Sequence, residues 1–220
     1  MSYQKLFFQQ YLHDFFHIGA ILPSSGALGR AGAAYLARKQ GPARVLEVGA
    51  GTGAFTAEIM PLLIPGDTLD VVEINPNLMD VLKQRFSQES RFQRPGIEVN
   101  FITDDVRHIA KNQLYDYIVL SLPLTNFPPS LVQEILDQMM CQLKPGGVFS
   151  YVKYIFISRF KYVFGGTATR AAMQANQQII QEFADKYQIE RRAVLRNIPP
   201  TWVYYWQKEA TDAKRTDRHR

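Results

Sequence analysis

The sequence of 220 residues contains one cysteine, Cys141, which excludes a disulfide within the chain and a metal site built from cysteines. No apolar run approaches the ~20 residues that a transmembrane helix needs. Charged residues are also few, at 20%, and the formal net charge is only +5. A mildly basic chain is compatible with binding nucleic acid or an anionic membrane, and its charge alone favours neither. We therefore expect a cytoplasmic protein without a metal site.

Short apolar runs alternate with helical periodicity from Ala43 to Lys208, and this rhythm predicts an α/β fold built from βαβ units. The expected strands are residues 43–50, 68–74, 97–105, 115–123, 148–156, 190–198 and 201–207. The expected helices are residues 53–63, 77–86, 130–143 and 168–187, and KPGG at 144–147 is expected to be a turn. The last two strands are joined by a short Pro-Pro turn, whereas parallel strands need a long crossover, so these two should form an antiparallel hairpin. The prediction is a doubly wound, mostly parallel sheet that ends in an antiparallel strand.

The chain divides into three expected parts. Residues 1–18 should form an amphipathic helix, residues 19–208 a single α/β domain, and residues 209–220 a tail. The tail, EATDAKRTDRHR, has almost no apolar residue, so we expect it to be disordered.

The stretch VLEVGAGTGAF, at 45–55, follows the first expected strand and places glycines at positions 49, 51 and 53. Glycine lets a backbone turn sharply and approach a ligand closely. In a dinucleotide-binding turn the third glycine falls one residue later, and here Glu47 precedes the first glycine by two residues. A carboxylate at this place repels phosphates and attracts an ammonium or a sulfonium group. The turn therefore indicates a ligand with a cationic amino-acid end.

Acidic residues also follow the second and third expected strands. Glu73 comes about 20 residues after the turn, where a carboxylate typically holds two ribose hydroxyls. Asp104 and Asp105 end the third strand, where an acid can accept a hydrogen bond from an adenine amino group. A plain tight turn would explain the glycines alone, but not the acids at three successive strand ends.

VLEVGAGTG, VVEINP, ITDDV and LKPGG resemble, in order and spacing, the motifs of class I S-adenosylmethionine-dependent methyltransferases. The resemblance covers roughly residues 41–208 and implies a Rossmann-like sheet of seven strands, with S-adenosyl-L-methionine as cofactor and S-adenosyl-L-homocysteine as product. It places Glu47 and the backbone of the turn at the methionine end of the cofactor, the turn being Gly49, Ala50, Gly51, Thr52 and Gly53. It implies that Glu73 binds the ribose and that Ile74 packs on the adenine. Asp105 would contact the adenine, with Val106 beside it.

The segment GAILPSS, near the start, is expected to cap a helix through Ser24 or Ser25. Amides at the start of that helix could meet the carboxylate of the cofactor.

The segment SLPLTNFPP, at 121–129, bears on the methyl acceptor because it follows the fourth strand. In methyltransferases that act on amino groups of nucleic-acid bases, an Asn or Asp begins a four-residue motif here and an aromatic residue ends it. This chain has Ser121, Leu122, Pro123 and Leu124 instead, so the ring that would stack on a flipped base is missing. Carbonyl groups around Ser121 and Leu122 could orient an amine. The alternative interpretation is a loop, delimited by prolines, that only ends the strand and has no role in catalysis.

The N-terminal segment has an aromatic face at helical spacing, formed by Phe7, Phe8, Tyr11, Leu12 and Phe15. Such a face can lie in a membrane interface, although it can equally pack on the domain itself. A second candidate for lipid contact follows the fifth strand, in SYVKYIFISRFKY. There, Lys153 and Arg159 could bind a headgroup phosphate, with Tyr151 and Tyr154 beside them, and the alternative is a strand with solvated lysines and core aromatics.

GAILPSS, VGAGTGAFT, SLPLTNFPP and LKPGGVFSYVKY together resemble the bacterial phospholipid N-methyltransferases that are related to rRNA adenine dimethyltransferases. This resemblance implies methylation of phosphatidylethanolamine toward phosphatidylcholine, in one or several rounds, with ornithine lipid or another aminolipid as an open variant. We expect peripheral binding to the anionic inner face of the membrane and no nucleic-acid partner. The sequence does not fix the oligomeric state, although we expect a monomer.

Two other hypotheses stay open. One is an rRNA adenine dimethyltransferase, against which stand the missing Asn and aromatic residue after the fourth strand. The other is a cofactor-binding sensor without catalysis, which would bind the cofactor and methylate nothing.

Overall fold

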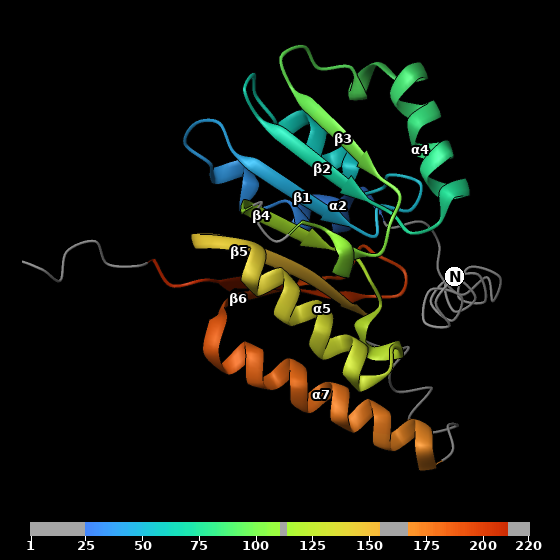
Figure 1. Ribbon diagram of the computed structural model, residues 1–220, viewed down its shortest axis with the longest axis vertical. Coiled ribbons are helices and arrows are strands. Elements are labelled where there is room, and N and C mark those ends of the chain that lie inside the picture. Colours follow the sequence, from blue (N-terminus) through green and yellow to red (C-terminus); the bar gives the residue numbers. More distant parts are fainter. Residues whose placement is uncertain (1–24, 111–113, 155–166, 211–220) are drawn as a thin grey trace, which may run out of the picture.

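The computed structural model describes residues 25–110, 114–154 and 167–210. These residues form a seven-stranded sheet, shown in Figure 1, in the order β3-β2-β1-β4-β5-β7-β6. The strands are β1 (Arg44–Val48), β2 (Thr68–Val72), β3 (Glu98–Ile102), β4 (Tyr115–Leu120), β5 (Leu143–Tyr154), β6 (Gln188–Val194) and β7 (Thr201–Gln207). Strands β1 to β5 pair in parallel, and β7 lies antiparallel between β5 and β6. The predicted fold class and its C-terminal hairpin are confirmed. The predicted N-terminal helix and most of the predicted tail lie outside the described residues, so the domain boundaries stay predictions.

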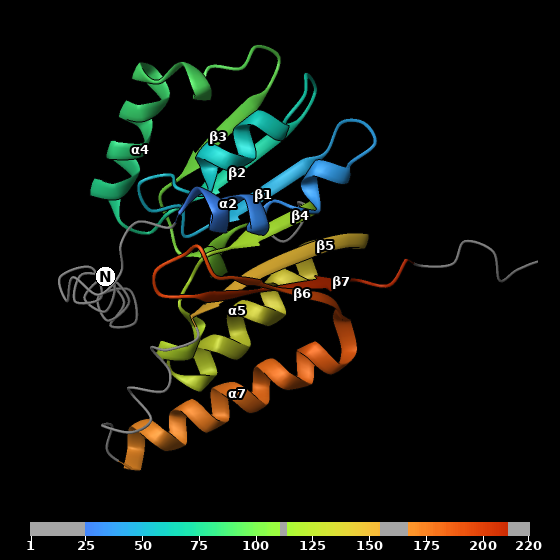
Figure 2. The same cartoon turned by 180° about the vertical axis from the view of Figure 1, so that it is seen from behind.

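Helices cover both faces of this sheet (Figures 1 and 2). One face carries α5 (Pro129–Gln142) and α7 (Thr167–Tyr187), and the other carries α2 (Gly26–Gly32), α3 (Thr56–Ile59) and α4 (Pro76–Gln88). Short 3-10 helices occur at Leu36–Arg38, Met60–Leu62, Ser90–Phe92, Val106–His108 and Leu124–Asn126. Each face has its own buried apolar cluster, because successive side chains of a strand point to opposite faces.

The segment KPGG departs from its prediction as a turn. Residues 144–147 belong to β5, which runs without interruption from Leu143 to Tyr154. The pairing partners on β5 jump from Leu143 to Val148 while those on β4 advance only from Tyr115 to Tyr117. The glycines therefore form an irregularity inside the strand, where Gly146 has a φ of 77°.

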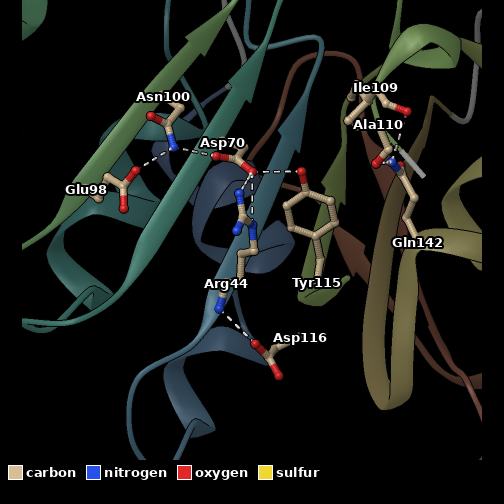
Figure 3. Close-up of polar contacts among 9 residues, drawn as sticks. All are labelled: Arg44, Asp70, Glu98, Asn100, Ile109, Ala110, Tyr115, Asp116 and Gln142. Atoms are coloured by element: carbon tan, nitrogen blue, oxygen red, sulfur yellow. Dashed lines mark hydrogen bonds and ion pairs between the residues drawn. The ribbon is translucent and has the colours of Figure 1, made fainter. Parts of the chain in front are cut away.

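A buried polar network ties the central strands together (Figure 3). Asp70, on β2, accepts hydrogen bonds from Arg44 Nη2 at 2.8 Å, Tyr115 Oη at 2.7 Å and Asn100 Nδ2 at 2.8 Å. Burial, followed by the hydrogen bond to Asp70 and its charge, raises the pKa of Tyr115 above its ordinary value. Residues from β1, β2, β3 and β4 thus share one carboxylate, which fixes the relative positions of four strands.

The carboxyl ends of the parallel strands lie along one edge of the sheet, on the right in Figure 1. The register pairs Thr201 of β7 with both Tyr154 of β5 and Val194 of β6, which brings the β6–β7 turn to this same edge. Ligands of open α/β sheets bind beyond the carboxyl ends of the strands. Among the helices of residues 25–110, 114–154 and 167–210, none combines the length and the apolar character that a transmembrane span requires.

Candidate functional site

The glycine turn joins β1 to α3 and is bonded to the end of the neighbouring strand. The amides of Gly49 and Ala50 both donate to the carbonyl of Val72, at 2.9 and 3.3 Å. Gly49, Gly51 and Gly53 have φ angles of 75°, 56° and 87°, which side-chain-bearing residues rarely adopt. The turn therefore needs glycine at all three positions for its backbone path.

The space around the three glycines differs. A Cβ atom on Gly49 would come within 2.6 Å of Leu122, and one on Gly53 would come within 2.4 Å of Leu82, so both glycines also permit close packing. A Cβ atom on Gly51 would meet nothing within 4 Å. The middle of the turn thus faces open space, which a ligand beyond the strand ends could enter.

Glu47 lies under the turn with no solvent-exposed surface. Its Oε1 accepts a hydrogen bond from Thr56 Oγ1 at 3.0 Å, and its Oε2 is buried without a hydrogen-bond partner among the described residues. Burial raises the pKa of Glu47 to about 7, against the lowering effect of the Thr56 bonds and with a further increase from the charge of Glu73. A buried acceptor that lacks a donor can take one from a ligand, and its charge would favour a cation.

Glu73 follows β2 and connects the turn to the start of α4. Its Oε2 accepts from the amide of Gly51 at 2.8 Å, and its Oε1 accepts from the amide of Asn75 at 2.9 Å. Burial raises the pKa of this carboxyl group, although its backbone hydrogen bonds act in the opposite direction. The structure therefore brings together the glycine turn and the acid that was predicted to bind a ribose.

Asp105 begins the 3-10 helix that follows β3, and its side chain is bound by Arg107. The carboxylate accepts from Arg107 Nη2 at 2.7 Å, from Nε at 3.0 Å and from the backbone amide at 3.0 Å. Burial acts to raise the pKa of Asp105, but these hydrogen bonds and the charge of Arg107 outweigh it and leave that pKa below its ordinary value. Asp105 is thus held ionised, while Val106 and Ile74 lie buried in the cluster under the same edge.

The loop after β4 lies directly beside the glycine turn. Ser121 Oγ donates to the carbonyl of Gly49 at 2.5 Å, and the amide of Ser121 donates to the carbonyl of Val48 at 3.0 Å. Leu122 is buried, and its carbonyl accepts from the amide of Leu124 at 2.9 Å. The hydroxyl of Ser121 therefore binds this loop to the turn. If Ser121 and Leu122 position an amine, they do so through their backbone groups.

Three further residues stabilise the site, and the sequence analysis did not predict their roles. Arg85, on α4, donates to the carbonyl of Thr52 in the turn. Arg107 bridges Asp105 and Glu134, with 2.6 Å between its Nη1 and Glu134 Oε2. Asn176, on α7, donates to the carbonyl of Phe127 at 2.8 Å and so anchors the end of the loop after β4. Arg107 could have been suspected from its place two residues after Asp105, whereas nothing local in the sequence links Asn176 to Phe127.

Ser25 caps α2 as predicted. Its Oγ accepts from the amide of Leu28 at 3.2 Å, and its own amide donates to Asn197 Oδ1 at 3.0 Å. A contact between this region and the carboxylate of a cofactor stays a prediction. Ser24, the other candidate for the cap, lies outside the described residues.

Of the predicted lipid-contact residues, Tyr151, Lys153 and Tyr154 belong to β5 itself, and Arg159 follows it. Tyr151 is buried and its ring stacks on Tyr204, with 4.9 Å between the ring centroids, so its burial supports packing rather than contact with a headgroup. Lys153 pairs in register with Trp202, and burial lowers its pKa. The side chain of Tyr154 is not described, and Arg159 and the aromatic residues Phe7, Phe8, Tyr11, Leu12 and Phe15 lie outside the described residues.

The site fits a cofactor that combines a cationic amino-acid end with a nucleoside. The open space beside Gly51, the unpartnered oxygen of Glu47 and the carboxylate of Glu73 lie at the glycine turn and the end of the neighbouring strand. These groups would hold the methionine end and the ribose, and the buried surface beside Ile74 and Val106 would adjoin the adenine.

Comparisons with known proteins agree with this geometry. Residues 45–147 match the family described as methyltransferase domain. The chain is 26% identical to an ornithine lipid N-methyltransferase of Singulisphaera acidiphila over 161 residues, which is 73% of each chain. It is 34% identical to ribosomal RNA small subunit methyltransferase A of Parasynechococcus marenigrum over 101 residues, which is 46% of this chain and 30% of that protein.

The fold is also shared with a solved methyltransferase. The structure of the N-methyltransferase NodS from Bradyrhizobium japonicum, in complex with S-adenosyl-L-homocysteine, superposes with a TM-score of 0.56 at 16% identity. The superposition covers 81% of this chain and 85% of NodS. Together with the glycine turn and its acids, these similarities show that residues 45–147 form a methyltransferase domain of the class I S-adenosylmethionine-dependent type, with S-adenosylmethionine as the cofactor.

Proposed function

We propose that this methyltransferase acts on the amine of a membrane aminolipid, converting phosphatidylethanolamine toward phosphatidylcholine or methylating the amine of an ornithine lipid. One or several methyl groups would be added while the protein is bound peripherally to the cytoplasmic face of the membrane. The proposal concerns the acceptor and the location, since the cofactor and the type of reaction follow from the site and the family.

The observation that carries the proposal is the character of the loop after β4. This loop touches the glycine turn, yet Leu122 and Leu124 are both buried and the hydroxyl of Ser121 is turned toward the carbonyl of Gly49. A flipped base needs a stacking partner and hydrogen-bond partners for its edge, and none of these side chains supplies them. A primary amine needs only carbonyl acceptors and the exclusion of water. The similarity to an ornithine lipid N-methyltransferase supports the same acceptor.

When bound, S-adenosylmethionine supplies a methyl group activated by its sulfonium centre. Glu47 and the backbone of Gly49 to Gly53 would orient the amino-acid end, and Glu73 would fix the ribose. The loop after β4, held by Ser121 below and by Asn176 at its far end, would position the amine for in-line attack. The amine would attack in its neutral form, after its ammonium has lost a proton to water, and the methyl–sulfur bond that breaks would leave S-adenosyl-L-homocysteine as the product. Positioning by these residues therefore accounts for the reaction without a strong catalytic base.

Purified protein incubated with labelled cofactor tests the proposal directly. Vesicles with phosphatidylethanolamine, vesicles with ornithine lipid and small-subunit ribosomal RNA are offered separately, with Glu73→Gln as the matched control. We expect label in one of the lipids, greatly reduced by the substitution. Label in RNA and in neither lipid would contradict the proposal.

An RNA adenine methyltransferase is the second candidate, favoured by the 34% identity to a ribosomal RNA methyltransferase. That match is confined to 46% of this chain, and the four residues at 121–124, directly after β4, lack the Asn and the aromatic residue that the reaction on adenine uses.

A further inference from the structure

The turn between β6 and β7 exposes two large aliphatic side chains close together. Leu195 is 73% exposed and Ile198 is 71% exposed. Among the large apolar side chains that the structure describes, the next most exposed is Ile189, at 45%. Exposure of this degree is unfavourable in water, and two such residues in one turn point to a partner that covers them.

The same turn is held rigidly from below. Asn197 lies between the two exposed residues in the sequence, but its side chain is buried. Its Nδ2 donates to the carbonyl of Pro199 at 2.9 Å and to Thr201 Oγ1 at 3.1 Å, and its Oδ1 accepts from the amide of Ser25 at 3.0 Å. The turn is thus fixed both to β7 and to the start of α2. The exposed apolar residues therefore lie on a turn whose conformation is fixed by hydrogen bonds.

The charge around this turn is positive. Residues 191–200 include three arginines and no acidic residue. Arg191 and Arg196 are exposed, and the guanidinium of Arg191 lies over the ring of Trp202, with 4.9 Å to its centroid. Aliphatic side chains flanked by arginines suit the boundary between the headgroups and acyl chains of an anionic bilayer.

The turn also lies at the edge of the sheet formed by the carboxyl ends of the parallel strands, which is the edge of the cofactor site. Val194 and Thr201 flank it, and Thr201 is paired with Tyr154 at the carboxyl end of β5 (Figures 1 and 2). The glycine turn and the loop after β4 occupy the carboxyl ends of β1 and β4 along this same edge. A bilayer that covers the β6–β7 turn would therefore present its headgroups to the side of the sheet where the cofactor binds.

We propose that the β6–β7 turn docks the enzyme on an anionic lipid surface, with Leu195 and Ile198 inserted and Arg196 among the headgroups. The proposal rests on the proposed aminolipid substrate for its biological purpose. The physical claim, which is binding of this turn to a bilayer, can be tested without any methyl transfer.

The test is sedimentation of the full-length protein with vesicles of phosphatidylglycerol and phosphatidylethanolamine. Leu195→Ser and Ile198→Ser are combined in one variant. Ile189→Ser is the matched control because it removes an exposed aliphatic side chain from β6, about 20 Å along the chain from Leu195. Calorimetry with S-adenosyl-L-homocysteine confirms that each variant is folded.

Loss of two inserted side chains should weaken vesicle binding at least tenfold in the double variant. The control should bind vesicles as the unaltered protein does, and all three proteins should bind S-adenosyl-L-homocysteine equally. Vesicle binding by the double variant within twofold of the unaltered protein would overturn the proposal. An unaltered protein that does not sediment with vesicles would overturn it as well, and would assign the two side chains to a protein partner.

The proposed function is tested separately from vesicle binding, by methylation of a dispersed lipid. Failure to methylate a dispersed short-chain aminolipid would refute the aminolipid substrate, whatever the vesicle result. Methylation of the dispersed lipid by the double variant at the unaltered rate, together with weakened vesicle binding, would support both proposals.

Discussion

Glu47 gives the sharpest quantitative prediction, because its carboxyl group is wholly buried and its pKa lies at about 7 in the folded protein. An unfolded chain ionises this group near its ordinary value of 4.5. Below pH 4.5 both states are protonated, and the group imposes no penalty on folding. As the pH rises toward 7, the unfolded state loses its proton first, so the cofactor-free protein loses stability. A shift from 4.5 to about 7 corresponds to a loss of about 3 kcal/mol.

The substitution Glu47→Gln removes this titration and keeps an oxygen that can accept from Thr56. The two proteins should differ little in stability at pH 4.5. At pH 8 the cofactor-free variant should be more stable by about 3 kcal/mol. Urea unfolding of both proteins at several pH values measures this difference, and titrating groups other than Glu73, whose charge acts on Glu47, cancel in the comparison. A difference that stays constant from pH 4.5 to 8, or that shrinks as the pH rises, would refute the account of Glu47.

The same group should make cofactor binding depend on pH. A cationic ligand favours the ionised form of Glu47, so the affinity of the unaltered protein should rise toward pH 7, by up to about tenfold per unit below the pKa. Glu47→Gln should bind more weakly at pH 8 and lose this slope. Calorimetry with S-adenosylmethionine across pH 5 to 8 measures the affinity of each protein and its dependence on pH. The same pH dependence in both proteins would show that the cofactor does not interact with the charge of Glu47.

Three further substitutions have expected outcomes. Glu73→Gln leaves one oxygen where two backbone amides now donate, so it should lower cofactor affinity at least tenfold by calorimetry and unfolding stability by about 1–3 kcal/mol; unchanged affinity would place the ribose elsewhere. Asp70→Ala should lower the free energy of unfolding by about 3 kcal/mol, because it removes the buried carboxylate that accepts from Arg44, Asn100 and Tyr115 on three other strands; exposed Glu98→Ala is the control and should cost far less. Asn176→Ala should lower kcat about tenfold while the cofactor affinity stays constant, because it releases the loop that positions the acceptor. A loss of cofactor affinity as large as the loss of kcat would indicate general unfolding instead.

The features that the sequence predicted correctly are local or repetitive. The alternation of strands and helices follows from side-chain periodicity, and the antiparallel hairpin follows from the short turn between β6 and β7. The glycine turn has three positive φ angles at the three glycines that the spacing singled out, and Glu73 lies one residue after β2. Each of these predictions needed only residues near one another in the chain.

The features that were missed depend on contacts between distant residues or on degrees of exposure. The path of KPGG depends on pairing with β4, and the anchoring of the loop by Asn176 joins positions 49 residues apart. Tyr151 was expected to meet a headgroup, but packing against Tyr204 buries it. Conversely, Leu195 and Ile198 looked like ordinary strand residues in sequence, and only the fold shows that they point outward.

The central claim is methyl transfer to an aminolipid, and mass spectrometry of the lipids of a host that expresses the protein tests it most directly. The account predicts a new lipid heavier by one to three methyl groups on its amine, absent from cells that express Glu73→Gln at the same level. An unchanged lipid profile in cells whose soluble protein binds S-adenosylmethionine would contradict it.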